Sequence, residues 1–241
     1  MRLKTVATGS SGNCHLLIAD SGETLILDCG VPIKEIKKGL DWNIRNVVGC
    51  IVSHAHSDHS KSVKDFEAMG IPVFAPYRYD IGVKFKGRWK IRAFDLTDLN
   101  GNWTHTDANG EPCPIYGFLI EHPWMGRMLY ITDCAFVKWR FKGVNHILLG
   151  VNYDSALLSG DDAKRNHVIR GHMSIDTACE FVKANASPDL QNVVMCHLSS
   201  ENADPDSFIQ KMRGVVPATC DVLVAIPGME LVLRKGDECP F

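Results

Sequence analysis

Short apolar runs alternate with amphipathic stretches along the chain. The runs at 25–27 and 47–52 are bounded by glycine and polar residues, which is typical of buried strands. Further strands are expected at 115–121, 127–132, 146–151 and 192–196, the first two forming a pair around the turn at 123–126. A helix is expected over 61–69, where Gly70 ends it and Pro72 follows, and a second from Ser174, its N-cap, to about Asn185.

This mixture of buried strands, hairpin strands and helices indicates a layered α/β (α+β) fold rather than a helical bundle or a pure β-barrel. The 241 residues show no repeat, low-complexity tract or obvious linker, so we expect residues 1–241 to form a single domain. Residues 95–114 are rich in Asn, Asp, Gly, Thr and Pro. A loop of this length in a compact domain is usually functional or mobile.

The composition changes this picture little, with 45% hydrophobic and 22% charged residues. No apolar run has the length of a membrane span, and the N-terminus lacks the apolar region of a signal peptide, so we expect a cytoplasmic protein without a membrane partner. The net charge of -2 argues neither for nor against nucleic acid. The nine cysteines form no Cys-x-x-Cys pair, and we expect them to act as small buried hydrophobes in a reducing compartment.

The strongest chemical signal is His54-Ala55-His56-Ser57-Asp58-His59, directly after the apolar run at 47–52. Imidazoles and carboxylates suit zinc, manganese or iron. On a helix these four donors could not all converge on one point. In a tight loop leaving a strand they would form two adjacent pockets, one from His54 and His56 and the other from Asp58 and His59.

Six residues cannot complete two metal sites, so other strand ends must supply ligands. Asp133 follows the apolar run at 128–131 and is placed to bridge two metals, and His197 closes the strand at 192–196. His105 lies in the irregular loop and is a third candidate, with Asp107 or His122 as alternatives.

Two more residues are expected to assist the metal site. Asp28 ends the run at 25–27 and is expected to orient a ligand or the histidine loop rather than to bind metal. His172 lies between Gly171 and the helix that Ser174 opens. There it would contact a phosphate or protonate a leaving oxygen, the alternative being a capping or packing histidine.

Basic residues alternate between positions 84 and 92, and on a strand they would share one face. Such a face would track a DNA backbone, with Lys86 and Arg88 as substrate contacts. The alternative is a solvated edge strand on which lysines block aggregation. The basic residues are Lys84, Lys86, Arg88, Lys90 and Arg92, with Phe85 and Trp89 between them.

The motif His54-x-His56-x-Asp58-His59 resembles the signature of the metallo-β-lactamase superfamily. Three further segments resemble the WalJ/YycJ family and its phage-encoded relatives, which are single-domain hydrolases associated with 5′-to-3′ DNA exonuclease activity. These segments are Gly9-Ser10-Ser11-Gly12-Asn13-Cys14, Gly171-His172-Met173-Ser174 and Cys196-His197-Leu198-Ser199-Ser200-Glu201-Asn202. The resemblance extends from about residue 5 to residue 205.

The resemblance implies a four-layer αββα sandwich with two divalent metal ions at one edge between the sheets. It assigns His54, His56 and His105 to one ion, Asp58, His59 and His197 to the other, and Asp133 to both. Asp58 would also position a nucleophilic hydroxide. The chain departs from the family in an expanded region at 99–114 and at Tyr153, where a histidine is usual. This change at Tyr153 would alter substrate contacts.

The function expected from these observations is a dinuclear metal-dependent hydrolase, first of all a phosphodiesterase acting on DNA. The alternatives are a small-molecule hydrolase such as a cyclic nucleotide phosphodiesterase and, behind it, a lactam or thioester hydrolase. A flavodiiron-type oxidoreductase would need a flavin domain for which the chain has no room, and the complete donor set disfavours a non-enzymatic binding module. Zinc is the expected metal, with manganese and iron open, and the oligomeric state is also open, a homodimer included.

Overall fold

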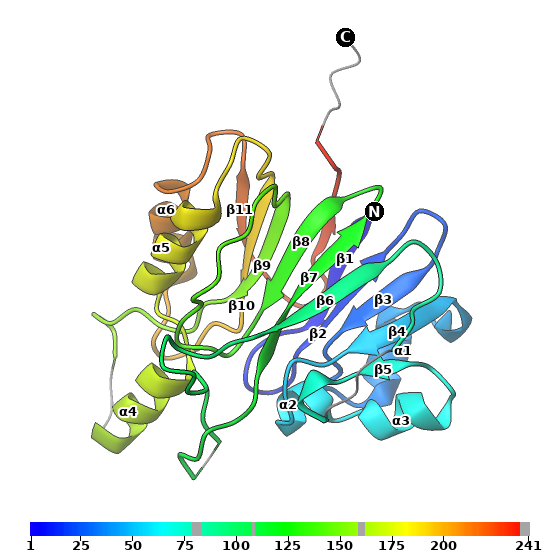
Figure 1. The fold of residues 1–241 in the computed structure, drawn as a ribbon, viewed down its shortest axis with the longest axis horizontal. Coiled ribbons are helices and arrows are strands. Elements are labelled where there is room, and N and C mark those ends of the chain that lie inside the picture. Colours follow the sequence, from blue (N-terminus) through cyan, green and yellow to red (C-terminus); the bar gives the residue numbers. More distant parts are fainter. Residues whose placement is uncertain (79–82, 108, 159–161, 237–241) are drawn as a thin grey trace.

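Two mixed six-stranded sheets face each other in the computed structural model, which describes residues 1–78, 83–107, 109–158 and 162–236 (Figure 1). The strand order is β12-β1-β2-β3-β4-β5 in the first sheet and β11-β10-β9-β8-β7-β6 in the second. The first sheet comprises β1 (Arg2–Ala7), β2 (Cys14–Ile18), β3 (Thr24–Leu27), β4 (Val47–Ile51), β5 (Val73–Phe74) and β12 (Glu230–Val232). The second comprises β6 (Lys90–Asp95), β7 (Tyr116–His122), β8 (Gly126–Ile131), β9 (His146–Gly150), β10 (Asn192–Cys196) and β11 (Asp221–Val224).

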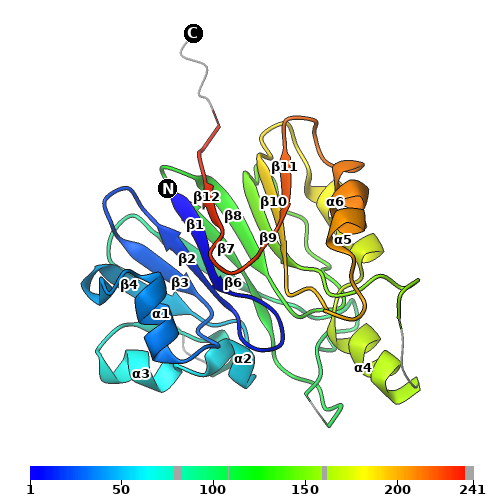
Figure 2. The same ribbon diagram turned by 180° about the vertical axis from the view of Figure 1, so that it is seen from behind.

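Helices cover the outer face of each sheet, as the reverse view shows (Figure 2). On the first sheet lie α1 (Ile33–Gly39) and α3 (Val63–Ala68), and on the second α5 (Ile175–Asn185) and α6 (Pro205–Arg213). Three apolar clusters fill the spaces between the four layers, and the central one joins both sheets through residues such as Leu25. The expected αββα sandwich is therefore confirmed.

The remaining short elements are α2 (Ser57–Ser60) and α4 (Asp162–Gly171) and two 3₁₀ turns, Ile44–Asn46 and Pro76–Arg78. Among the described residues no helix is both long and apolar enough to cross a bilayer. Eight of the nine cysteines lie in the described part of the chain, where all are free thiols and seven are buried, as predicted.

The predicted elements are found with small shifts at their ends. The helix from Ser174 is confirmed, because the Ser174 hydroxyl caps α5 by accepting a hydrogen bond from the Thr177 amide at 3.1 Å. The helix expected over 61–69 begins later, at Val63, because the backbone turns at Ser62. Ser62 is held there by hydrogen bonds to the carbonyls of Cys29 and Val31, and the separate helix α2 precedes it.

The single basic strand expected between positions 84 and 92 was wrong. Strand β6 begins only at Lys90, and the preceding residues form an irregular turn in which Gly87 has a φ of +81°. Trp89, one of the two aromatic residues between these basic positions, is buried. Lys86 and Arg88 are exposed, but they lie on this turn and not on a strand face.

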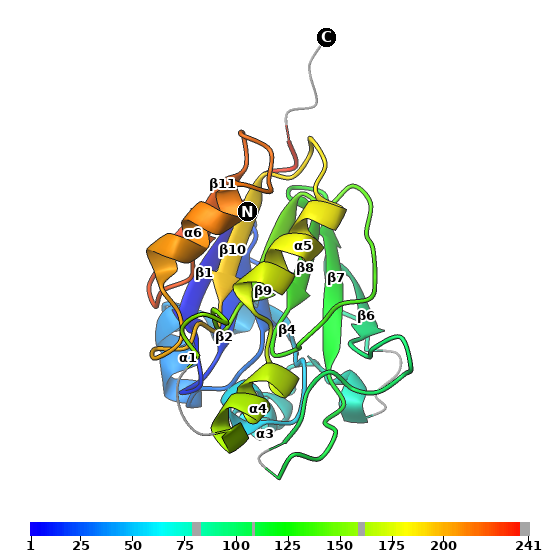
Figure 3. The same ribbon diagram turned by 90° about the vertical axis from the view of Figure 1, so that its left-hand side faces the viewer.

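One edge of the sandwich collects the carboxyl ends of five strands. Strands β3 and β4 run parallel in the first sheet, as do β8, β9 and β10 in the second. Helices α2 and α4 lie at this same edge (Figure 1), and the side view shows α4 there as well (Figure 3). Side chains that follow these strands converge here, which is where ligands bind in open sheets of this kind.

Candidate metal centre

Seven donor side chains form two adjacent groups at this edge. In each group one ligand atom per residue lies within 4.8 Å of the others. The first sheet supplies the loop after β4 and the short helix α2, and the second supplies the residues that follow β8 and β10 and the loop after β6. The tight loop expected for the whole motif therefore ends at His56, and Asp58 and His59 lie in the first turn of a helix. The first group is His54, His56 and His105, and the second is Asp58, His59, Asp133 and His197.

Hydrogen bonds to Nδ1 of two histidines determine which nitrogen of each imidazole is free to bind a metal ion. The Nδ1 atom of His59 lies 2.6 Å from the Asp28 carboxylate, and Nδ1 of His105 lies 2.8 Å from the Gly171 carbonyl. Both partners only accept, so each Nδ1 carries the proton and the lone pair of a neutral ring is on Nε2. In His105 that atom lies 3.0 Å from His56 Nδ1, inside the first donor group.

A hydrogen bond to Ser53 likewise places the proton of His54 on Nδ1. The Ser53 hydroxyl donates its one proton to Asp28 Oδ2 at 2.9 Å, so it accepts from His54 Nδ1 at 3.0 Å. Burial lowers the pKa of His54 well below its usual value, which keeps the ring neutral. Its Nε2 lone pair is then available to a metal ion.

Asp133 lies between the two groups. Its Oδ2 atom is 3.1 Å from His59 Nε2 and 3.8 Å from His54 Nε2, and its Oδ1 atom is 3.4 Å from His197 Nδ1. Burial alone would raise the pKa of Asp133, but the imidazoles of His197 and His59 hold it well below its usual range. An ionised carboxylate that faces both groups has the position of a bridging ligand.

These residues fit metal ions on an observation independent of the motif. Among the described residues, no hydrogen-bond partner reaches the buried Nε2 atoms of His54 and His197. A buried polar atom without a partner costs about 1–3 kcal/mol, so such atoms are rare unless a ligand satisfies them. Neutral imidazoles and ionised carboxylates are the donor forms that zinc and similar divalent ions bind.

Three residues of this region have left-handed backbone conformations, which residues other than glycine rarely adopt. The φ angles are +56° at Asp28, +48° at Asp133 and +57° at His197. Each residue directly follows or closely follows a strand end, where the chain must turn sharply to aim a side chain along the sheet edge. Such strain costs on the order of 1–3 kcal/mol per residue and is concentrated at functional sites.

Asp28 holds several site elements at once. Its carboxylate accepts hydrogen bonds from the Ser53 amide at 2.7 Å and from the Tyr130 hydroxyl at 2.5 Å, besides those from Ser53 Oγ and His59. Tyr130 comes from the second sheet and Ser53 from the first, so the network joins both sheets beneath the donors. This is the orienting role expected of Asp28, and its contacts are to a ligand and to the loop rather than to the centre itself.

The backbone around Asp58 is packed closely enough to require glycine at position 30. A Cβ atom on Gly30 would lie 1.6 Å from the Asp58 carbonyl oxygen. That oxygen accepts a hydrogen bond from the Asn13 amide at 2.7 Å, and the Asn13 side chain lies 3.0 Å from His59 Nε2. The segment 9–14 thus holds Asp58 and His59 in place through Asn13.

A cavity of about 710 Å³ opens over the donors. His172 lines it, with its ring stacked on that of His197 at 5.4 Å and its Nδ1 atom 4.0 Å from Asp133. No lysine or arginine is found among the described residues that line this cavity. The rest of its wall is mostly small and polar, for example Ser10, Ser199 and Asn202.

Several residues considered as site residues lie elsewhere. Tyr153 is buried at 6% exposure and is absent from the described cavity wall, where its neighbour Asn152 takes the place. His122 is at the far end of β7 beside Trp124, and Arg88 lies at that same end.

Asp107 borders the cavity, but its carboxylate accepts hydrogen bonds from the backbone amides of a turn. His105, and not Asp107, completes the first donor group.

Four supporting residues carried no clear signal in the sequence. Tyr130 and Ser53 read as ordinary strand and loop positions, and their contacts to Asp28 appear only when the sheets are stacked. Asn13 lay within the segment 9–14 noted for family resemblance and Asn152 lay next to Tyr153, but their partners were not foreseeable. Asn152 donates to the His197 carbonyl at 2.9 Å and so fixes that ligand's backbone.

Comparisons with known proteins agree with this geometry. A family model described as the metallo-beta-lactamase superfamily matches residues 7–117. The chain is 26% identical over 235 residues to exodeoxyribonuclease YycJ of Bacillus anthracis, a match that covers 84% of each chain.

Solved structures show the same fold. The metallo-beta-lactamase fold protein YhfI from Bacillus subtilis has a TM-score of 0.64 at 14% identity, over 95% of this chain and 98% of that one. The short form of human tRNase Z has a TM-score of 0.60 at 14% identity, over 97% and 100%. The donor groups and these matches together indicate a metal-dependent hydrolase of the metallo-beta-lactamase fold that is similar over most of its length to exodeoxyribonuclease YycJ.

Proposed function

We propose that this protein is a dinuclear metal-dependent phosphodiesterase that degrades DNA from the 5′ end. The observation that carries the proposal is the Asp133 carboxylate between two groups of metal donors, at the base of an open cavity. The name of the Bacillus anthracis relative, an exodeoxyribonuclease, favours DNA as the substrate.

The first donor group, His54, His56 and His105, would hold one ion, and Asp58, His59 and His197 would hold the other. Zinc is the metal that we expect. Two divalent ions bound there would lower the pKa of water toward neutrality and neutralise charge that develops on a phosphodiester.

Asp58 would direct the attacking water in addition to binding metal. Burial would raise its pKa, but the neighbouring imidazoles of His197 and His59 lower it, so the carboxylate is ionised at neutral pH and can accept a hydrogen bond. Its side chain is 23% exposed, towards a cavity that it lines. It is therefore placed to orient a water molecule for attack.

His172 would act on the substrate rather than on the donors. It lines the cavity wall next to His197 and directly follows α4. Since the described wall carries no lysine or arginine, an imidazole here is well placed to donate to a phosphate oxygen or to the leaving oxygen. General acid assistance of this kind typically contributes about 10²–10⁴-fold in rate.

The test is cleavage of a 5′-phosphorylated single strand with a fluorescent label at its 3′ end. Metal-loaded protein should shorten the strand stepwise from the 5′ end, so that ever shorter labelled fragments accumulate. The control is the His56→Ala, Asp58→Ala double variant, which should leave the strand intact. Immediate release of the labelled terminal nucleotide would give the opposite polarity, and no cleavage of any nucleic acid would overturn the proposal.

A panel of cyclic nucleotides belongs in the same experiment. The cavity is large enough for a small-molecule substrate, at about 710 Å³. Turnover of a cyclic nucleotide with no turnover of DNA would reassign the site to small-molecule hydrolysis.

A further inference from the structure

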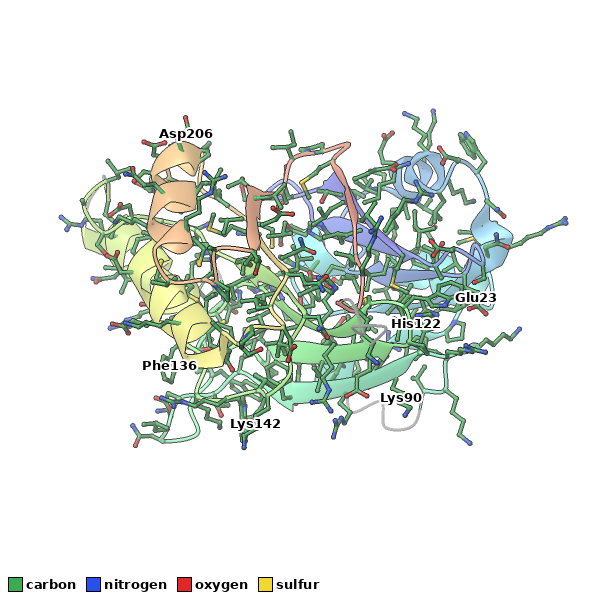
Figure 4. The ribbon with its side chains drawn as sticks, turned by 90° about the horizontal axis from the view of Figure 1, so that it is seen from above. Glu23, Lys90, His122, Phe136, Lys142 and Asp206 are labelled. Carbon is green, nitrogen blue, oxygen red and sulfur yellow. The ribbon has the colours of Figure 1, made fainter. Side chains whose placement is uncertain are left out.

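A second depression, of about 330 Å³, lies at the end of the sandwich opposite to the metal donors. We call it the basic depression, because Arg88, Lys90, Arg127 and Lys235 line it together with one carboxylate, that of Glu121. These residues come from the turn before β6 and the first residue of β6, from the hairpin of β7 and β8, and from the chain after β12. Figure 4 looks onto this end, with Lys90 and His122 labelled near it.

The fold holds these cations in place. Arg127 Nε lies 3.1 Å from the Glu121 carboxylate, and its guanidinium donates to the Lys142 carbonyl at 2.8 Å. The Lys235 amide donates to the Trp124 carbonyl at 3.1 Å, which ties the segment after β12 to the hairpin turn. The hairpin thus fixes the guanidinium of Arg127 and the backbone at Lys235, although the protein as a whole carries a net charge of -2.

An aromatic side chain stands next to the basic depression. Trp124 occupies the hairpin turn with 39% of its surface exposed, and its ring packs edge-on against His122 at 5.2 Å. His122 in turn packs on the buried Trp89 at 4.8 Å, so the exposed indole is supported from beneath. Trp89 itself cannot stack with a base, since only 7% of it is exposed.

We infer that the basic depression and Trp124 form a second binding surface for a nucleic acid strand, one that holds the strand away from the metal donors. Lysine and arginine neutralise backbone phosphates, and an adjacent aromatic ring stacks with bases of any sequence. The described wall of the cavity over the metal donors has neither lysine nor arginine, so it offers no such side chain to neutralise the backbone phosphates. The inference rests on the proposed function for the identity of the ligand.

The spacing of the two sites sets a length requirement. Strand β8 and the residues after it connect Gly126, in the basic depression, to Asp133 at the metal donors. At about 3.3 Å per residue the two sites are on the order of 20 Å apart. That distance corresponds to about six nucleotides at the 3.4 Å spacing of stacked bases, so a trinucleotide reaches one site only.

The test measures binding of labelled single strands to metal-free protein, which cannot degrade them by the proposed chemistry. The variant is Arg88→Glu, Lys90→Glu. Its matched control is Lys183→Glu, Arg213→Glu, which makes the same charge change on exposed residues of α5 and α6. For a 20-nucleotide strand the first variant should bind on the order of tenfold more weakly than the control, with a salt slope smaller by about 1.4.

A third variant separates stacking from charge. Trp124→Ala should weaken binding of the same strand on the order of tenfold and leave the salt slope unchanged, because stacking releases no counterions. A trinucleotide cleaved by the metal-loaded protein should be turned over equally by all variants. Thermal unfolding of each variant shows that the fold is retained.

The outcomes distinguish this inference from the proposed function. Equal binding of the 20-nucleotide strand by the charge-reversed variant and its control would overturn the inference, even if the protein cleaves DNA. Weakened binding in the variant, with no cleavage by metal-loaded wild-type protein, would support the surface and overturn the nuclease assignment. Absence of any strand binding by wild-type protein would overturn the inference as well.

Discussion

Replacing Asp28 with asparagine tests how the metal donors are held. In the wild-type protein Oδ2 accepts from Ser53 Oγ, His59 Nδ1 and the Tyr130 hydroxyl, while Oδ1 accepts from the Ser53 amide. An asparagine that keeps its oxygen towards the first three donors turns its NH₂ group against the Ser53 amide. One buried donor then loses its partner, and three hydrogen bonds lose the negative charge of their acceptor.

The magnitude follows from these contacts. An orphaned buried donor costs about 1–3 kcal/mol, and each of the three bonds that become neutral loses about 1 kcal/mol, so the free energy of unfolding should fall by about 4–6 kcal/mol. Loss of the carboxylate behind His59 should also lower metal affinity by about 10- to 100-fold, the usual effect of removing a partner of a metal-binding histidine.

Urea unfolding and competition with a chelator measure the two effects. The matched control is Tyr130→Phe, which removes one donor and leaves the carboxylate in place. We expect it to lose only about 1–2 kcal/mol of stability and less than tenfold in metal affinity. Wild-type metal affinity in the Asp28→Asn protein would refute the role that we assign to this carboxylate.

Three other predictions follow. Gly30→Ala should abolish metal binding, because its Cβ would lie 1.6 Å from the Asp58 carbonyl oxygen; metal content equal to wild type in the purified variant would contradict this. His172→Ala should keep its full metal content while turnover falls by about 10²-fold or more, as elemental analysis and DNA cleavage together would show; unchanged turnover would remove the role of His172. Burial lowers the pKa of His146 to about 4, so the unfolded chain takes up a proton at about pH 6.5 and the native protein only near pH 4. Native stability should therefore fall by about 3 kcal/mol as pH drops through this window, and urea unfolding of His146→Gln should show a shallower pH dependence; parallel curves would refute it.

Much of the fold could be predicted because short stretches of sequence determine its strands and helices. The apolar runs at 47–52 and 192–196 are each followed within two residues by a metal-binding histidine, His54 and His197, and both are strands that end at the same edge. Ser174 marked the start of α5 because a hydroxyl cap is a local interaction. The donors of the histidine loop lie within six residues, so their proximity required no knowledge of the tertiary structure.

The rest depended on contacts between distant segments. Tyr130 meets Asp28 across 102 positions of sequence, and no periodicity reveals such a pair. The basic residues from 84 to 92 alternate as on a strand, but Gly87 turns the chain and the strand begins at Lys90. Their partners in the basic depression, Arg127 and Lys235, come from other elements and were invisible in the local pattern.

The most direct test of this account is DNA turnover measured while metal is added stepwise to metal-free protein. Two donor groups that share Asp133 predict that cleavage of a 5′-phosphorylated strand is absent without metal and rises to its maximum as the second equivalent per chain is bound. Full activity at one equivalent, activity without metal, or no cleavage at two equivalents would contradict a two-metal phosphodiesterase.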